Sequence, residues 1–152
     1  MKLTTLCYIE NDNCYLMLHR TKKEVDANKG KWIGVGGHFQ EGEAPNECVL
    51  REVLEETGLY LTEYKLRGIV TFISDIWEDE CMFLYTASEY QGELRECDEG
   101  DLMWVPKTEV MLLNTWEGDK IFLDLLMNQT GFFELKLIYE GNVLKKHKVK
   151  VY

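Results

Sequence analysis

The stretch GHFQEGEAPNECVLREVLEETGL, residues 37–59, joins a glycine-rich turn to a strongly acidic helical pattern. Pro45 suits the first turn of a helix, and Gly58 suits the position just after the last turn. The spacing therefore predicts a helix over residues 44–57. A strand-like segment over residues 32–39 precedes it, and the glycines in that segment allow the backbone to approach a ligand closely.

The predicted helix carries three carboxylates on one arc of its surface. A helix advances about 100° per residue, so Glu52, Glu55 and Glu56 face a similar direction. Apolar side chains that a core would bury occupy the other arc, at Leu50, Val53 and Leu54. At roughly 6 Å and an effective dielectric constant near 20, each carboxylate pair repels by about 2–3 kcal/mol. Such a face indicates a hard cation with oxygen ligands, either Mg²⁺ or Mn²⁺.

The same stretch resembles the Nudix box, G-x5-E-x7-R-E-U-x-E-E-x-G-U, where U is a bulky aliphatic residue. The chain matches every specified position, at Gly37, Glu43, Arg51, Glu52, Val53, Glu55, Glu56, Gly58 and Leu59. An acidic amphipathic helix alone is typical of a solvated surface, but the full set of matches favours the Nudix interpretation. The resemblance implies an α/β fold, a Nudix-type α/β/α sandwich with a central mixed β-sheet, formed as a single domain over residues 1–152.

The resemblance also implies a metal site. Its candidate ligands are the carboxylates of Glu52, Glu55 and Glu56, together with the backbone carbonyl of Gly36. Arg51 lies one turn before Glu55, so we expect it to orient neighbouring carboxylates. Glu43 precedes the helix and is expected to organise the loop.

In Nudix enzymes, water activated by divalent metal attacks a phosphorus atom of a diphosphate linkage. Glu55 is one candidate for the general base of this reaction. The rival is Glu99, in the turn CDEGD of residues 97–101, which could be a metal ligand or the base. The residues alone also allow Glu99 to belong to a solvated acidic turn.

Three further segments resemble the MutT-type branch of the family. They are KWIGVGGHFQEGE at residues 31–43, DEGDLMWV at residues 98–105 and TWEGD at residues 115–119. This resemblance implies Mg²⁺-dependent hydrolysis of oxidised purine nucleoside triphosphates, such as 8-oxo-dGTP, to a monophosphate and pyrophosphate. Another nucleoside diphosphate-X substrate is the alternative, and a non-catalytic nucleotide sensor is a further one that the intact box disfavours.

The candidate substrate-binding residues lie largely outside the box, at Ile33, Gly37, Phe72, Trp116 and Asp119. In animal members of the branch, the tryptophan matching Trp116 stacks on the base and an aspartate pair reads its edge. This chain keeps only Asp119, because Gly118 takes the other place. An asparagine and a phenylalanine of those relatives are replaced by Ile33 and Ala27. Trp116 and Phe72 are also compatible with a purely structural role in the core.

The formal net charge of −10, from 27 acidic and 17 basic residues, argues against a long nucleic acid as partner. We expect a small nucleotide substrate and no membrane partner, because no stretch approaches the roughly 20 apolar residues of a membrane span. The N-terminus does not resemble a signal peptide. Five cysteines without metal-type spacing are interpreted as free thiols, so the expected compartment is the cytoplasm. Monomer and homodimer stay open alternatives.

Apolar periodicity and turn residues predict the remaining elements. Strands are expected over residues 3–10, 14–20, 64–74, 80–88, 100–105, 132–139 and 143–152. A short helix is expected over residues 107–112 and a longer one over residues 118–129. Residues 21–31 are polar and unperiodic, and the sequence predicts a loop there.

Overall fold

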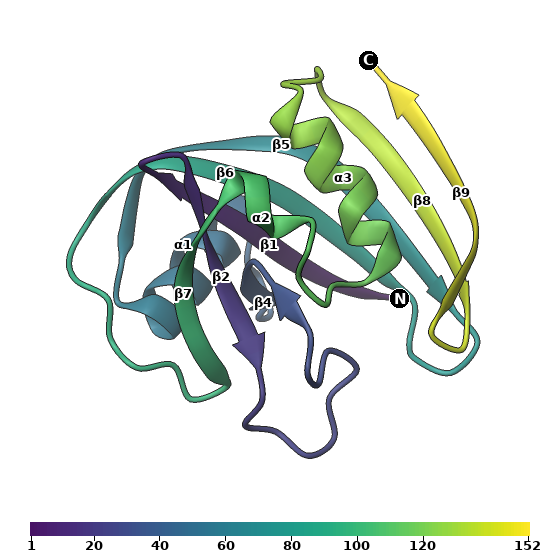
Figure 1. Ribbon diagram of the computed structural model, residues 1–152, viewed down its shortest axis with the longest axis horizontal. Helices are drawn as coiled ribbons and strands as arrows, with labels where there is room; N and C mark the ends of the chain where they lie inside the picture. Colours follow the sequence, from purple (N-terminus) through teal and green to yellow (C-terminus); the bar gives the residue numbers. More distant parts are fainter.

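The computed structural model describes residues 1–152 and contains the elements shown in Figure 1. The strands are β1 (Lys2–Asn11), β2 (Cys14–Arg20), β3 (Trp32–Ile33), β4 (Val35–His38), β5 (Tyr60–Ser74), β6 (Glu80–Gln91), β7 (Gly100–Pro106), β8 (Phe133–Glu140) and β9 (Val143–Val151). The helices are α1 (Pro45–Thr57), α2 (Lys107–Val110) and α3 (Glu117–Met127). Every predicted helix and strand is present, although several boundaries differ.

The strands form a mixed sheet, as the resemblance implied. Its order is β3-β2-β1-β6-β5-β8-β9, with β4 also paired to β1 and β7 also paired to β2. The pairs β1–β6 and β5–β8 are parallel, and the other pairs are antiparallel. Strand β1 thus lies at the centre, where it contacts β2, β4 and β6.

Helices cover both faces of this sheet. Successive side chains of a strand point to opposite faces, and in β1 Leu6 and Tyr8 join the apolar cluster that contains Phe122 of α3. Cys7 and Ile9 join a second cluster, which contains residues of α1. Figure 1 shows α1 and α3 on opposite sides of the sheet, so the expected α/β/α sandwich is confirmed.

Helix α1 begins and ends as the sequence predicts. The Glu47 side chain accepts a hydrogen bond from the backbone N–H of Ala44, which satisfies a free donor at the start of the helix. Gly58 ends it in the left-handed conformation with φ 80°. The Leu54 carbonyl accepts the Gly58 N–H, and Arg95 donates further hydrogen bonds to the carbonyls of Leu54 and Glu55 at that end.

The prediction of which helix face is buried was partly wrong. Val53 is fully buried, but Leu54 is 41% exposed, and Glu56 is only 8% exposed. Glu52 and Glu56 therefore face the glycines of strand β4, whereas Glu55, with a side chain that is 57% exposed, points outward. A Cβ atom added at Gly37 would lie 2.6 Å from the carboxyl carbon of Glu52, so a side chain there would displace that carboxylate from its observed position.

Two predicted strands differ in their extent. Strand β5 begins at Tyr60, directly after the helix, rather than at residue 64. Irregular register between Leu61 and Tyr64, and again near Gly68, breaks the apolar alternation that the prediction required. The segment predicted over residues 32–39 is divided into β3 and β4 at Gly34, where an added Cβ would lie 2.7 Å from the Cys7 carbonyl oxygen.

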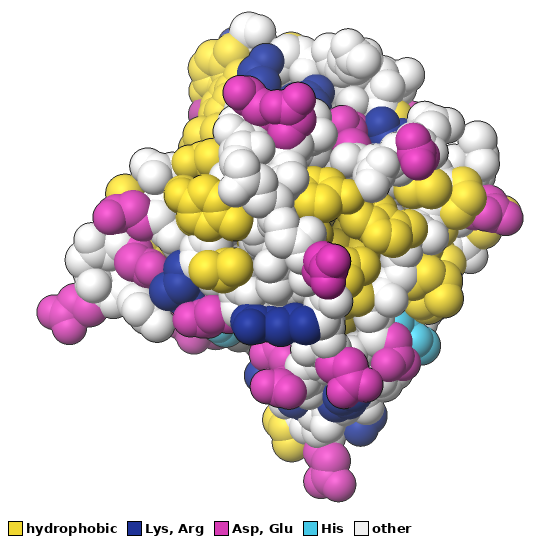
Figure 2. Space-filling model, turned by 90° about the vertical axis from the view of Figure 1, so that its left-hand side faces the viewer, with side chains coloured by type: hydrophobic (Ala, Val, Ile, Leu, Met, Phe, Trp, Pro, Cys, Tyr) yellow, Lys and Arg dark blue, Asp and Glu magenta, His cyan; other side chains and the backbone are white.

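None of the helices combines the length and apolar character needed to cross a membrane. All five cysteines are free thiols, and Cys7, Cys48 and Cys97 are buried. Acidic side chains outnumber basic ones on the face shown in Figure 2, in keeping with the net charge of the chain.

Phe122 tests the core between α3 and the sheet, because its side chain is fully buried in that cluster. We expect Phe122→Ala to lower the free energy of unfolding by about 3–5 kcal/mol, since it removes the ring and leaves a cavity. Urea unfolding measures the change. The control is Leu112→Ala at a side chain that is 82% exposed, where a loss above about 0.5 kcal/mol would contradict the account.

Candidate active site

One cavity of about 410 Å³ brings together residues from both halves of the chain. Its walls come from β1, β4, β5, β6 and α3, from α1, and from the segment between β2 and β3. At one end it contains the carboxylates of Glu52, Glu56 and Glu99. Apolar side chains line the remainder, including Leu6, Val70, Phe72, Met82, Phe122 and Leu137. A cavity that combines apolar walls with charged and polar side chains is typical of small-molecule sites.

Arg51 holds the acidic residues of the helix together. Its guanidinium bonds Glu43 at 2.6 and 2.8 Å, Glu52 at 2.9 Å and Glu55 at 3.2 Å. It also donates to the carbonyl oxygen of His38 at the end of β4. The hydrogen bonds from Arg51 lower the pKa of Glu43 to about 2. The predicted orienting role of Arg51 agrees with this geometry.

Glu56 lies deepest of the three helix carboxylates. Its Oε2 accepts a hydrogen bond of 3.2 Å from the backbone N–H of Gly36. Burial raises the pKa of Glu56, and the negative charge of Glu99 raises it further. This side chain therefore favours either a proton or a cation in its vicinity.

Glu99 immediately precedes β7 and is paired with two cationic side chains. Arg20 donates to it at 2.8 Å, and Lys23 lies 2.8 Å away on the other carboxylate oxygen. Burial alone would raise the pKa of Glu99, but the hydrogen bond from Lys23 and the charges of Arg20 and Lys23 lower it overall. Glu99 is thus an ionised group of the pocket rather than part of a solvated turn.

The donor set fits a hard cation, although the side chains are not gathered around one. The structure contains no group of three or more His, Cys, Asp or Glu residues arranged to hold a metal ion. The cause is visible in the hydrogen bonds, because Arg51 draws Glu52 and Glu55 toward itself. Glu52, Glu56 and Glu99 nevertheless line the same pocket, and the space left by Gly37 accommodates a carboxylate. These oxygen donors suit Mg²⁺.

Trp116 forms the wall at the other end of the pocket. It is buried at the start of α3 and packs edge-on against Phe72 and Tyr139. The Lys31 ammonium lies 4.8 Å from the centre of its ring. Trp116 is therefore both a core residue and a pocket residue, and the same holds for Phe72.

Asp119 is a buried acid that faces the pocket from α3. Burial, with a contribution from the negative charge of Glu80, raises the pKa of Asp119 to about 8. A side chain at Gly118 would require its neighbours to move, because a Cβ there would lie 2.5 Å from Leu137 Cδ1 and 2.9 Å from the Tyr139 hydroxyl. The hydroxyl instead accepts a hydrogen bond from the Gly118 N–H.

Most of the residues selected from the sequence line this one pocket. They are Ile33, Gly36, Gly37, Glu52, Glu56, Phe72, Glu99, Trp116 and Asp119. Arg51 and Glu55 lie outside it, and the Glu55 side chain is 57% exposed. Their roles as metal ligands, base or substrate contacts stay predictions.

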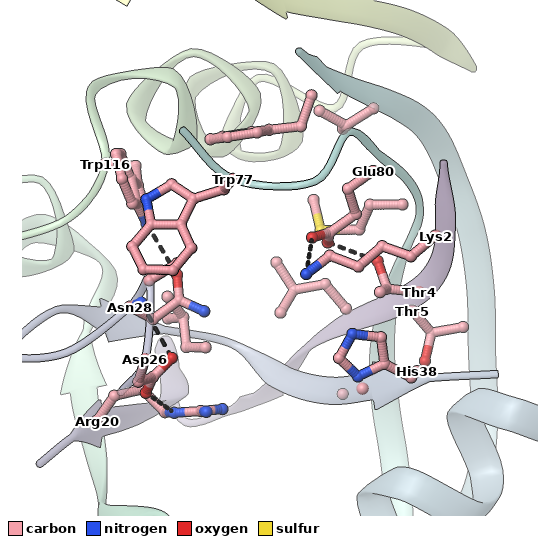
Figure 3. A pocket seen from close by; sticks show the side chains of 18 of the residues that line it. Lys2, Thr4, Thr5, Arg20, Asp26, Asn28, His38, Trp77, Glu80 and Trp116 are labelled. Atoms are coloured by element: carbon pink, nitrogen blue, oxygen red, sulfur yellow. Dashed lines mark hydrogen bonds and ion pairs between the residues drawn. The ribbon is translucent and has the colours of Figure 1, made fainter. Parts of the chain in front are cut away.

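Sequence reasoning missed several pocket residues, notably those of the loop between β2 and β3. Trp116 Nε1 donates to Asn28 Oδ1, and the Asn28 N–H donates to Asp26. Asp26 in turn accepts from Arg20 (Figure 3), and Arg20 also donates to Glu99. This chain of hydrogen bonds joins the aromatic end of the pocket to the acidic end. Nothing periodic marks these residues in the sequence, and only the mixture of charged residues in the loop hinted at them.

The family model described as NUDIX domain matches residues 2–126, so the chain belongs to the Nudix family and is of the MutT type. Nudix hydrolases generally use divalent metal ions such as Mg²⁺. The chain is 30% identical over 144 residues to an uncharacterized Nudix hydrolase of Bacillus subtilis, YvcI, across 91% of this chain and 87% of that protein.

The chain is also similar to a second relative in sequence and to a solved structure. An oxidized purine nucleoside triphosphate hydrolase of Danio rerio is 30% identical over 122 residues, which cover 79% of this chain and 78% of that protein. The crystal structure of a mutator MutT protein from Bacillus halodurans superposes with a TM-score of 0.88 at 26% identity, covering 98% of this chain and 97% of that one.

The contribution of Arg51 can be tested through acid stability. The pKa of Glu43 is lower in the folded chain, so this acid contributes stability that is present above its unfolded pKa and lost as the pH falls toward about 2. We expect Arg51→Ala to be most destabilising near neutral pH and less so near pH 3. Urea midpoints at both pH values measure this. Arg95→Ala is the control, because the side chain of Arg95, between β6 and β7, bonds only backbone carbonyls of α1. A pH-independent loss in Arg51→Ala would contradict the account.

Asp119 should oppose folding as the pH rises. Between its ordinary value of 3.8 and about 8, the unfolded chain releases the proton that the folded chain keeps, so stability falls with increasing pH. The asparagine side chain of Asp119→Asn does not titrate. The free energy of unfolding of this variant, relative to the wild type, should therefore rise by about a few kcal/mol between these two pH values. Unfolding curves at several pH values measure the difference, with Asp124→Asn on the exposed side of α3 as the matched substitution. A difference that is the same at every pH would rule out a buried, protonated Asp119.

Proposed function

We propose that the protein is a Mg²⁺-dependent pyrophosphohydrolase that converts oxidised purine nucleoside triphosphates, such as 8-oxo-dGTP, to a monophosphate and pyrophosphate. The observation that carries this proposal is the single pocket with carboxylates at one end and Trp116, Phe72 and Asp119 at the other. A nucleotide needs both ends, because its phosphates require a cation and its base requires an apolar slot with a polar edge.

The acidic end is suited to hold the cation. Glu52, Glu56 and Glu99 would contribute carboxylate oxygens, and Gly36 would contribute its carbonyl. When bound, Mg²⁺ (or Mn²⁺) neutralises phosphate charge and lowers the pKa of an attacking water. Arg51 would keep Glu52 within reach of the site while it neutralises the repulsion among the carboxylates. Glu55 is a less direct candidate, since its side chain points outward toward Arg51.

The proton of the attacking water needs an acceptor that is ionised at neutral pH. Arg20 and Lys23 keep Glu99 in that form within the pocket. Glu55, the alternative base, lies outside the pocket. We therefore favour Glu99 for this role, with the paired Lys23 placing a positive charge at the acidic end of the pocket.

The aromatic end supports a purine substrate. Phe72 and Trp116 offer ring surfaces, and stacking of a base on an aromatic ring contributes about 1–3 kcal/mol with little selectivity. Selectivity would then come from Asp119, which is protonated at neutral pH and can both donate and accept a hydrogen bond. The Danio rerio relative named for oxidised purines agrees with this assignment. The proposed partner is a small nucleotide, and the proposed compartment is the cytoplasm.

A second candidate is hydrolysis of another nucleoside diphosphate-X compound. Two pocket walls favour it: Ala27 is smaller than the phenylalanine expected in animal relatives, and Ile33 is less polar than their asparagine. The chemistry at the acidic end would be the same.

The substrate assignment is tested by steady-state hydrolysis of 8-oxo-dGTP beside dGTP, dATP and ADP-ribose. We expect a preference of about tenfold or more for 8-oxo-dGTP, which is about 1.4 kcal/mol of transition-state discrimination. Mg²⁺ should be required, and EDTA should abolish turnover. The products should be monophosphate and pyrophosphate. Equal rates on all triphosphates would defeat the oxidised-purine assignment, and faster hydrolysis of ADP-ribose would favour the second candidate.

The roles of the carboxylates are tested by Glu52→Gln and Glu56→Gln. Each change keeps the side-chain size but removes a charge, so turnover should fall by about 100-fold or more while the fold is retained. Glu63→Gln, at an exposed position outside the pocket, is the matched control. Near-normal Mg²⁺-dependent rates in both pocket variants would remove these residues from the proposed site.

A further inference from the structure

Asn28 lies in the segment between β2 and β3, and its amide group has a well-defined orientation. The side chain lines the pocket beside Trp116, as Figure 3 shows. Its Oδ1 accepts a hydrogen bond of 2.8 Å from Trp116 Nε1. An indole nitrogen is a donor only, so the amide atom that faces it must be the oxygen. The Nδ2 group of Asn28 is therefore directed away from Trp116.

This Nδ2 group makes no hydrogen bond within the protein. The Asn28 side chain is bonded through its oxygen alone, to Trp116. The buried side-chain polar atom without a partner is the Tyr8 hydroxyl, so Asn28 Nδ2 is accessible rather than sealed in the core. Two N–H donors are thus available on the pocket side of the loop.

The protein holds Asn28 in place on both sides of the side chain. Its backbone N–H donates to Asp26 Oδ1 at 3.0 Å, and its carbonyl accepts from the Lys31 N–H at 2.8 Å. Asp26 is itself bonded to Arg20 at 2.9 Å. A donor fixed in this way loses little conformational entropy when a ligand binds to it.

The other polar side chains of this pocket include Glu80, whose carboxylate accepts a hydrogen bond from Thr4 and is paired with Lys2 (Figure 3). Phe72, Met82 and Phe122 supply apolar surface there, and Asp119 approaches from α3. In such a slot, each fixed donor or acceptor determines which ligands fit, because an unmatched polar group is costly to desolvate.

We infer that Asn28 is a specificity-determining residue whose Nδ2 donates a hydrogen bond to a carbonyl oxygen or ring nitrogen of a bound base. The inference rests on the proposed function, because only a substrate that carries a base would reach the amide. A base that presents an amino group at this position places donor against donor and is rejected. One that presents an acceptor is retained.

Asn28→Asp and Asn28→Ala test the inference together. Asn28→Asp keeps an oxygen for Trp116 but loses the donor, whereas Asn28→Ala loses both without adding charge. In each variant kcat/KM for 8-oxo-dGTP should fall about tenfold or more. Of dGTP and dATP, the nucleotide whose base has no acceptor facing Asn28 Nδ2 should show a smaller change in kcat/KM. The inhibition constant of inorganic tripolyphosphate, which has no base, should change less than about twofold.

Asn114→Ala is the matched control. The Asn114 side chain donates to the Gly30 carbonyl of the same loop at 3.1 Å, but it does not line the pocket. This variant should retain the substrate preference of the wild type. An equal loss on every nucleotide and on tripolyphosphate in the Asn28 variants would show a structural role only and overturn the inference. So would unchanged kinetics.

A binding measurement separates this inference from the proposed function. Calorimetric titration with 8-oxo-dGMP and dAMP reports base recognition without any turnover. Suppose that the wild type hydrolyses no nucleotide but binds 8-oxo-dGMP about tenfold more tightly than both Asn28 variants do. The proposed function then fails and the inference stands. If the wild type hydrolyses triphosphates but the variants bind 8-oxo-dGMP as the wild type does, the inference alone fails. A wild type that binds neither monophosphate overturns the inference.

Discussion

Carboxylates that repel one another must be kept close together at the centre of this protein, and Arg51 is the residue that makes this possible. It bonds Glu43, Glu52 and Glu55 and is anchored to the carbonyl of His38 on β4. The helix can therefore turn an acidic face toward the sheet. The glycines of β4 are the steric counterpart of this electrostatic arrangement, because side chains there would occupy the space of the carboxylates.

The position of the pocket follows from the pairing of β1. This strand contributes to both apolar clusters and pairs with β4, so the glycines, α1 and the sheet meet at one place. Helix α3 packs on the opposite face of the sheet, and Trp116 and Asp119 at its N-terminal end line the same pocket. The loop between β2 and β3 then joins the two ends through Asn28, Asp26 and Arg20. One series of hydrogen bonds thus links Trp116, where we propose that the base binds, to Glu99 at the acidic end.

The sequence was sufficient to predict α1, the hairpin of β1 and β2, and the mixed α/β class, because caps, turns and box residues are local signals. It did not reveal that Leu54 would be exposed and Glu56 buried. Which face of α1 is buried depends on the glycines of strand β4, which packs against it. The early start of β5 was missed because its register shifts interrupt the alternation. Asn28 was missed because its role arises from contact with Trp116, which is distant in the sequence.

The central claim is that Glu52, Glu56 and Glu99, with the Gly36 carbonyl, form one cation site beside the base pocket. It is tested most directly by anomalous diffraction from crystals of the protein grown with Mn²⁺. The account predicts a peak within about 2.5 Å of carboxylate oxygens of Glu52 and Glu56, with Arg51 released from Glu52. A peak elsewhere on the acidic surface, or none at millimolar Mn²⁺, would contradict it.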